Sequence, residues 1–161
     1  MATDQLVQAE LNKDVVQRHF DAAISGDRVT ANALNADDYL SQLTYGHPDG
    51  GTFQGLAEVG SARARMISLL GITGIKLKEI IADGPVRVVA LVDAEGTDES
   101  GEPWFMPCVE LIQVVDGKIA EVRMFYQDTV RLLELARARE AAGLVEGHSG
   151  ELMPRKPVKH E

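Results

Sequence analysis

The first half of the chain carries hydrophobic residues with the spacing of amphipathic helices. In residues 13–25 apolar side chains recur every three or four positions, between the capping residue Asn12 and the natural stop Gly26. A later glycine-rich loop holds His47 and Asp49 and is a candidate lid over a binding site. The elements expected in this half are, in chain order, a helix, a short helix, a short strand, that loop and a third helix: 13–25, 28–35, 38–45, 46–51 and 56–70.

The second half changes to the alternating pattern of β-strands. Residues 75–82 alternate apolar and polar side chains, and residues 86–93 are rich in β-branched residues. Two further strands, 104–115 and 118–127, flank an Asp-Gly turn, and Asp128 caps a closing helix. Helices followed by consecutive strands predict an α+β fold. Its helices are expected to cover the concave face of a strongly curved antiparallel sheet and to leave a conical pocket.

The Asp-Gly turn leaves the direction of one acid, Glu110, open. A two-residue turn places Glu110 opposite Arg123 on the outer face, as a weak surface ion pair. A three-residue turn with Gly117 at positive φ places Glu110 opposite Val122 on the inner face. The spacing alone allows both arrangements. On the second strand the more apolar side is expected to face the core: Ala120, Val122, Met124 and Tyr126.

Composition and charge narrow the partners that this chain can have. Its 161 residues, 45% of them hydrophobic, fit one domain with a real core. Its net charge of −9 argues against nucleic acids and anionic membranes, because both bind basic surfaces. The single cysteine fits a reducing cytoplasm, and neither a membrane span nor a signal peptide is expected. We expect an N-terminal extension (1–11), one domain (12–142) and a polar, flexible tail (143–161).

Three stretches resemble a known superfamily. The segment VELIQVVDGKIAEVRMFYQD and the VRLLEL after it resemble the end of SnoaL-type polyketide cyclases, within the nuclear transport factor 2-like superfamily. Those proteins carry an acid or a histidine seven residues before the glycine of this turn, where this chain has Glu110. VVQRHFDAAISGD is similar to the first helix of ketosteroid isomerases, and NADDYL to an acidic strand entry of the superfamily. The resemblance implies that Glu110 points into a cavity and that the protein is a homodimer.

Three residues are candidates for acid–base catalysis. An inward Glu110 lies among apolar side chains, which raise its pKa and suit a general acid or a neutral hydrogen-bond donor. By resemblance, Asp93 matches the first catalytic aspartate of limonene epoxide hydrolases, and His19 the oxyanion-binding tyrosine of ketosteroid isomerases. The structural alternatives are a satisfied buried acid, a solvated strand end and a hydrogen-bonded core histidine. The side chains expected to line the cavity are Leu91, Trp104, Met106, Cys108, Val122, Met124 and Tyr126.

The chain also departs from each of these relatives. By the resemblance, the cyclases have an aspartate where this chain has Met124, limonene epoxide hydrolases an arginine where it has Leu91, and isomerases a base near Leu43. Our hypothesis is an enzyme without cofactor or metal that cyclises, isomerises or opens an epoxide in a hydrophobic polyketide- or terpenoid-like molecule. The alternative is a non-catalytic ligand-binding or dimerisation module of the same fold.

Overall fold

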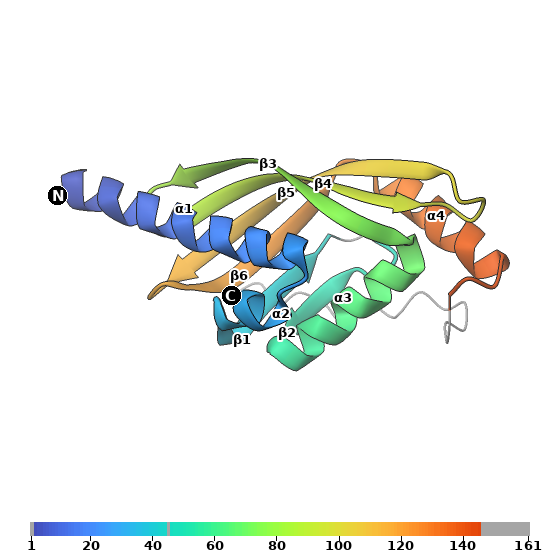
Figure 1. The fold of residues 1–161 in the computed structure, drawn as a ribbon, viewed down its shortest axis with the longest axis horizontal. Helices are drawn as coiled ribbons and strands as arrows, with labels where there is room; N and C mark the ends of the chain where they lie inside the picture. Colours follow the sequence, from blue (N-terminus) through green and yellow to red (C-terminus); the bar gives the residue numbers. More distant parts are fainter. Residues whose placement is uncertain (1, 45, 146–161) are drawn as a thin grey trace.

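The computed structural model describes residues 2–44 and 46–145, which form helices around a single six-stranded sheet (Figure 1). The helices are α1 (Ala2–Ser25), α2 (Arg28–Ala33), α3 (Leu56–Leu70) and α4 (Thr129–Ala141). The strands are β1 (Asn35–Leu43), β2 (Gly51–Gln54), β3 (Ile72–Asp83), β4 (Arg87–Thr97), β5 (Pro103–Val115) and β6 (Lys118–Tyr126). The predicted α+β fold is confirmed, with one short strand, β2, next to the predicted loop.

The sheet is curled and open, and its strands follow the order β2-β1-β6-β5-β4-β3. Neighbouring strands run antiparallel, except that β1 and β6 are parallel. Helices α1, α2 and α3 lie on one side of the sheet, and α4 lies near one end of it (Figure 1). Because β1 and β6 come from opposite ends of the domain, their pairing brings the first strand beside the last hairpin.

The helix ends follow the capping residues in most places. The Asp27 carboxylate accepts from Thr30 N at 3.0 Å, and the Asp128 carboxylate accepts from Arg131 N at 2.9 Å, as N-caps do. The predicted cap at Asn12 is wrong, because α1 begins at Ala2 and Asn12 lies inside it. The side chain of Asn12 is buried and donates to Pro85 O at 2.7 Å, which joins α1 to the turn between β3 and β4.

The register of the hairpin between β5 and β6 differs from both predictions, the one for a two-residue turn and the one for a three-residue turn. Asp116 (φ 50°) and Gly117 (φ 72°) form a two-residue turn between the paired residues Val115 and Lys118. The register then shifts by one residue, because β6 carries a β-bulge next to the turn. Beyond the bulge Glu110 pairs with Met124, which corrects both expected partners, Val122 and Arg123.

The bulge also changes which side chains of β6 begin the core. Ile119 is 1% exposed, whereas Ala120 is only partly buried. The prediction that Ala120 faces the core is therefore wrong, and Ile119 takes that place. From Val122 onward the alternation follows the prediction: Val122 and Met124 are buried and Tyr126 is partly buried. The extra residue therefore turns Glu110 to the inner face while keeping a tight turn.

Two clusters of buried side chains make up the core. The larger lies between α1, α3 and the inner face of the sheet, with Phe20 and Ile112 among its members. The smaller lies between α3, α4 and β5, and includes Leu70 and Leu132. Tyr126 packs against both clusters, so the end of β6 joins them.

None of the described helices is both long and apolar enough to cross a membrane. The predicted flexible tail falls almost entirely on residues 146–161, which lie outside the described part of the chain.

Candidate active site

Glu110 lies on the inner face of β5, between Ala90 of β4 and Met124 of β6. Both neighbours are buried, at 0% and 8% exposure, and Cys108 and Ile112 flank it along its own strand on the same face. The Glu110 side chain is partly exposed. Because it lies on the inner face of the sheet, its exposed part faces the interior of the fold and not the outer surface. Burial raises the pKa of Glu110 to about 7, because desolvation disfavours the charged carboxylate.

Arg63 of α3 is the positive charge that acts on this carboxyl group. It occupies the pocket-facing side of α3, between the buried Val59 and the partly buried Met66. Its charge opposes the effect of burial and lowers the pKa of Glu110. Glu110 therefore has a cation to stabilise its ionised form and an apolar wall that stabilises its neutral form.

Tyr39 of β1 completes this polar group. Its side chain is 1% exposed, and its hydroxyl lies within hydrogen-bonding reach of the Ser41 and Arg63 side chains. Burial raises the pKa of Tyr39 to about 12, and the Glu110 charge adds to the rise. The hydroxyl is therefore protonated at physiological pH and is available as a hydrogen-bond donor or acceptor.

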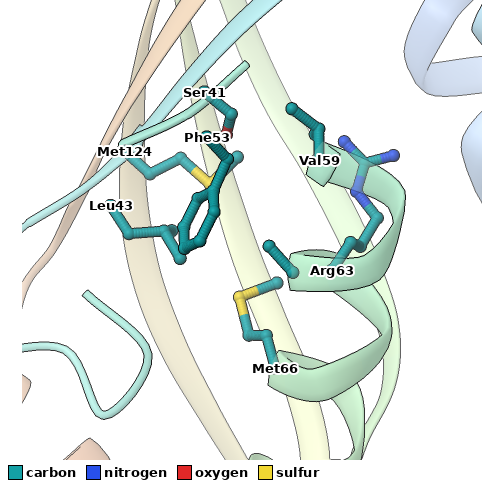
Figure 2. Close-up of a pocket in the computed structure, with 8 residues that line it drawn as sticks. Ser41, Leu43, Phe53, Val59, Arg63, Met66 and Met124 are labelled. Atoms are coloured by element: carbon teal, nitrogen blue, oxygen red, sulfur yellow. The ribbon is translucent and has the colours of Figure 1, made fainter. Parts of the chain in front are cut away.

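An apolar pocket opens between α3 and the strands β1, β2 and β6. In Figure 2 Leu43, Phe53 and Met124 extend from the strands toward Val59 and Met66 of α3. The hollow is narrow, with room for about one water molecule, so a larger ligand enters only when the side chains around it move. Glu110 is not part of the lining, but two residues related to it are: Met124, its strand partner, and Arg63, whose charge acts on its carboxyl group. The full lining is Ser41, Leu43, Phe53, Val59, Ala62, Arg63, Met66 and Met124.

The second catalytic candidate, His19, is 7% exposed and lies on the core-facing side of α1. Its Nδ1 is 3.2 Å from Ala31 O. A carbonyl oxygen only accepts, so Nδ1 carries the proton and Nε2 is the basic nitrogen. Burial lowers the pKa of His19 to about 4, and the charge of Arg63 lowers it further, so the ring is neutral at pH 7. Arg63 thus acts electrostatically on both His19 and Glu110.

The third candidate, Asp93, is not brought to the pocket. The inner face of β4 carries the buried residues Val92 and Ala94, so Asp93 projects from the opposite face. There its carboxylate pairs with Lys78 Nζ at 3.5 Å. Leu91 has the same parity and also lies on the outer face, which corrects its expected place in the cavity lining. The strand continues to Thr97, so Asp93 is not the strand end that the sequence suggested.

The other expected lining residues divide between the two core clusters. Trp104 and Met106 belong to the smaller cluster beneath α4, where Trp104 Nε1 donates to Leu70 O at 3.2 Å. Cys108, Val122 and Met124 belong to the larger cluster, on the same inner face as Glu110. Burial raises the pKa of the Cys108 thiol well above its usual range, so the thiol stays protonated. Among the seven expected lining residues, Met124 is the one in the wall of the described pocket.

The sequence reasoning missed Arg63, Tyr39 and Ser41 as site residues. One signal was present, since Arg63 interrupts an otherwise apolar stripe of a predicted helix. Tyr39 and Ser41 gave no comparable signal, because their proximity to Glu110 depends on the parallel pairing of β1 with β6. Within residues 2–44 and 46–145, no group of three or more His, Cys, Asp or Glu side chains is arranged to hold a metal ion.

Several solved structures share this fold and align with this chain over nearly their whole length. Bal32a, from a soil-derived mobile gene cassette, is 19% identical with a TM-score of 0.72, and the match covers 81% of this chain and 99% of that one. A putative SnoaL-like polyketide cyclase from Jannaschia sp. CCS1 is 20% identical with a TM-score of 0.66, over 80% and 93% of the two chains. TerC, co-crystallised with polyporic acid, is 24% identical with a TM-score of 0.68, over 79% and 98%.

No protein of curated function matches the chain in sequence. A family model for the SnoaL-like domain matches residues 16–122, which include the second part of α1, the pocket wall apart from Met124, and Glu110. A solved structure described as a nuclear transport factor 2-like protein from Burkholderia xenovorans matches 79% of the chain with a TM-score of 0.63, which shows the same fold. This chain therefore belongs to the SnoaL-like domain family.

Proposed function

We propose that this protein is a cofactor-independent enzyme that acts on a hydrophobic small molecule of polyketide or terpenoid type, with Glu110 as its general acid. The observation that carries the proposal is the enclosed position of the carboxyl group beside an apolar pocket, where its pKa is raised to about 7. An acid whose pKa lies near the working pH keeps its proton until it is needed and releases it readily.

The proposed chemistry is proton transfer to a substrate oxygen. Negative charge grows on oxygen as a carbonyl becomes an enol or as an epoxide C–O bond breaks, and Glu110 donates its proton there. The carboxylate that remains is stabilised by the charge of Arg63. His19 is the proposed base, taking a proton at Nε2 from substrate carbon in a cyclisation or isomerisation, or from attacking water in an epoxide opening. Asp93 has no part in this proposal because it lies on the outer face.

The substrate class rests on the pocket and on the family. The wall is formed mostly by aliphatic, aromatic and thioether side chains, which suit a hydrophobic ligand. The Jannaschia protein described as a putative polyketide cyclase and the TerC complex with polyporic acid are relatives by fold whose names point toward such molecules. Both names support a substrate of the polyketide or related aromatic type.

The experiment compares turnover and binding in the wild type and in Glu110→Gln. Glutamine keeps the shape and a hydrogen-bond donor but has no transferable proton, so turnover falls about 10²- to 10⁴-fold while ligand affinity changes little. The matched control is Glu95→Gln, at an exposed position on the outer face of the neighbouring strand, and it keeps full turnover. Equal turnover in wild type and Glu110→Gln would exclude general acid catalysis by Glu110.

The second candidate is a binding module without catalysis, and Met124 is the observation that favours it. Met124 stands directly opposite Glu110, at the position where the resemblance to the cyclases implies their aspartate. Tight binding of a polyketide-like ligand by the wild type, with no product formed from it, would favour this candidate over the enzyme.

We also propose that two copies pair through the outer face of the sheet. Phe105, Val109 and Phe125 are 68%, 41% and 47% exposed there, and Val109 and Phe125 are paired neighbours. A contiguous apolar face of this kind suits a self-complementary interface. Sedimentation equilibrium tests it: Val109→Lys turns a dimer into a monomer, whereas Val130→Lys, at an exposed position on α4, does not. A monomeric wild type at micromolar concentration would contradict the pairing.

A further inference from the structure

His47 is a buried hydrogen-bond donor that the described protein leaves without an acceptor. The side chain is 3% exposed, and its Nδ1 accepts from Asp49 N at 3.0 Å. Since Nδ1 accepts, the proton of the neutral ring sits on Nε2. No described residue accepts a hydrogen bond from Nε2. A buried donor without an acceptor is costly, so native proteins supply it with a partner, a water or a ligand.

The loop around His47 is held in place, and the donor is therefore preorganised. His47 N donates to Thr44 O at 3.1 Å, and Gly50 N donates to His47 O at 2.9 Å. The Asp49 carboxylate lies 3.4 Å from Arg65 Nε on α3. A Cβ at Gly50 would approach Thr44 O to 2.7 Å, so only glycine fits this tight turn. These contacts hold the loop against α3, where a candidate lid was expected from the sequence.

His47 is also connected to the wall of the pocket, through Tyr126 and Met66. Its ring centroid is 5.1 Å from that of Tyr126, and the Tyr126 hydroxyl is 3.4 Å from Met66 Sδ. Met66 belongs to the pocket wall, and Tyr126 follows Met124 on the inner face of β6. The same loop has a second buried polar atom without a described partner, Thr44 Oγ1. Two buried polar atoms of this short loop thus lack a partner among the described residues, and a ligand or a water can supply one.

We propose that His47 Nε2–H binds an uncharged acceptor oxygen of the ligand, such as a carbonyl or a quinone oxygen, beside Tyr126. This subsite rests on the proposed small-molecule function and adds a specificity-determining contact to it. The ligand is then an apolar molecule with one oxygen at Glu110 and another at His47. Burial lowers the pKa of His47 to about 4, so at pH 7 the ring is neutral and offers no charge to a carboxylate.

The test separates the two roles of the ring with two substitutions. His47→Asn keeps an acceptor for the Asp49 N–H, as an Asx turn does, but does not reach the position of Nε2. His47→Gln places an amide donor nearer to that position. The probes are 2,3-dimethyl-1,4-naphthoquinone, an uncharged molecule with carbonyl oxygens at both ends of its ring, and 2-naphthol, which has one oxygen.

Titration calorimetry with the full-length protein gives the affinities. We expect His47→Asn to bind the quinone about tenfold more weakly, as the loss of one hydrogen bond predicts, and to bind 2-naphthol as the wild type does. His47→Gln recovers part of the loss, and the melting temperature of His47→Asn stays close to that of the wild type. In ¹⁵N-histidine spectra of the wild type, the Nε2 signal of His47 shifts when the quinone binds.

Three results would overturn the subsite. His47→Asn could bind the quinone as tightly as the wild type, or lose both probes together with its melting temperature, which would make the role of His47 structural. The Nε2 signal could stay unchanged with the quinone bound, which would assign the donor to a buried water. Failure of the wild type to bind either probe is a different outcome, since it would count against the proposed pocket function as well as the subsite.

Discussion

Glu110 of β5 lies directly opposite Met124 of β6, with both side chains on the inner face of the sheet. A single bulge residue beyond the Asp116–Gly117 turn produces this pairing, since the same turn without a bulge pairs Glu110 with Arg123. Directly opposed side chains on one face are in contact range. The carboxyl group therefore has a thioether as its neighbour across the strands, and its nearest compensating charge comes from Arg63 on α3.

The first prediction concerns stability and pH. The pKa of Glu110 rises from 4.5 to about 7 on folding, so between these values the unfolded chain loses this proton while the folded protein keeps it. Stability falls as pH rises through this window and is constant with respect to this group above it. The pKa shift sets an upper limit of about 3 kcal/mol on this loss of stability. The real loss is smaller, because the carboxyl group is partly exposed and solvent screens it.

His19 and His47 act in the opposite direction, so the prediction is for a difference between proteins. Their pKa values are lowered from 6.5 to about 4, which costs stability as pH falls through that range. Urea unfolding of wild type and Glu110→Gln between pH 4 and 8 isolates the Glu110 contribution. The variant is expected to gain stability relative to the wild type as pH rises. A pH-independent difference would contradict the raised pKa.

The second prediction tests the role of Arg63. Replacing it with methionine removes the charge that opposes burial, so the pKa of Glu110 rises above its wild-type value. Arg65→Met is the matched control, because Arg65 lies on the same helix and pairs with Asp49 instead. Carboxyl ¹³C chemical shifts of labelled glutamate measure both. An equal effect of the two substitutions would show that Arg63 has no specific influence on Glu110.

The third prediction restores an acid where the resemblance implies that the cyclases have one. Met124→Asp puts a second carboxyl group opposite Glu110, and two like charges at this distance cannot both ionise cheaply. We expect one of the two groups to titrate higher than Glu110 does in the wild type, and stability to fall by about 2–5 kcal/mol at neutral pH through the lost packing. Met124→Leu, measured by the same unfolding and titration experiments, changes neither property appreciably. Independent titration of both carboxyl groups near 4 would contradict the pairing.

The sequence predicted the fold well where local pattern and fold agree. Asp27 and Asp128 cap their helices as expected, and the change from helical to strand spacing separates the two halves of the domain. Asn12 misled because its capping preference is local, whereas the residues before it continue the helix to Ala2.

The site was harder to predict than the fold. The alternation of side chains along a strand allowed both Glu110 and Asp93 to face the pocket. A bulge or a one-residue shift in pairing, however, exchanges the two faces of a strand, so alternation alone does not decide the face. The bulge in β6 leaves no clear mark in the sequence, and it decides where Glu110 points. Tyr39 and Ser41 reach the pocket through the pairing of the first strand with the last, which periodicity does not encode. Among the missed site residues, Arg63 was the easiest to predict, because it is a charged residue on an otherwise apolar stripe of a helix.

The proposed function depends on Glu110 being a partly buried acid that still carries its proton close to neutral pH. Titration of the Glu110 carboxyl ¹³C resonance tests it most directly, with the resonance assigned by its absence in Glu110→Gln. We expect a midpoint at about pH 7. A midpoint at or below 4.5, the ordinary value for a glutamate, would contradict it and would remove the proposed general acid.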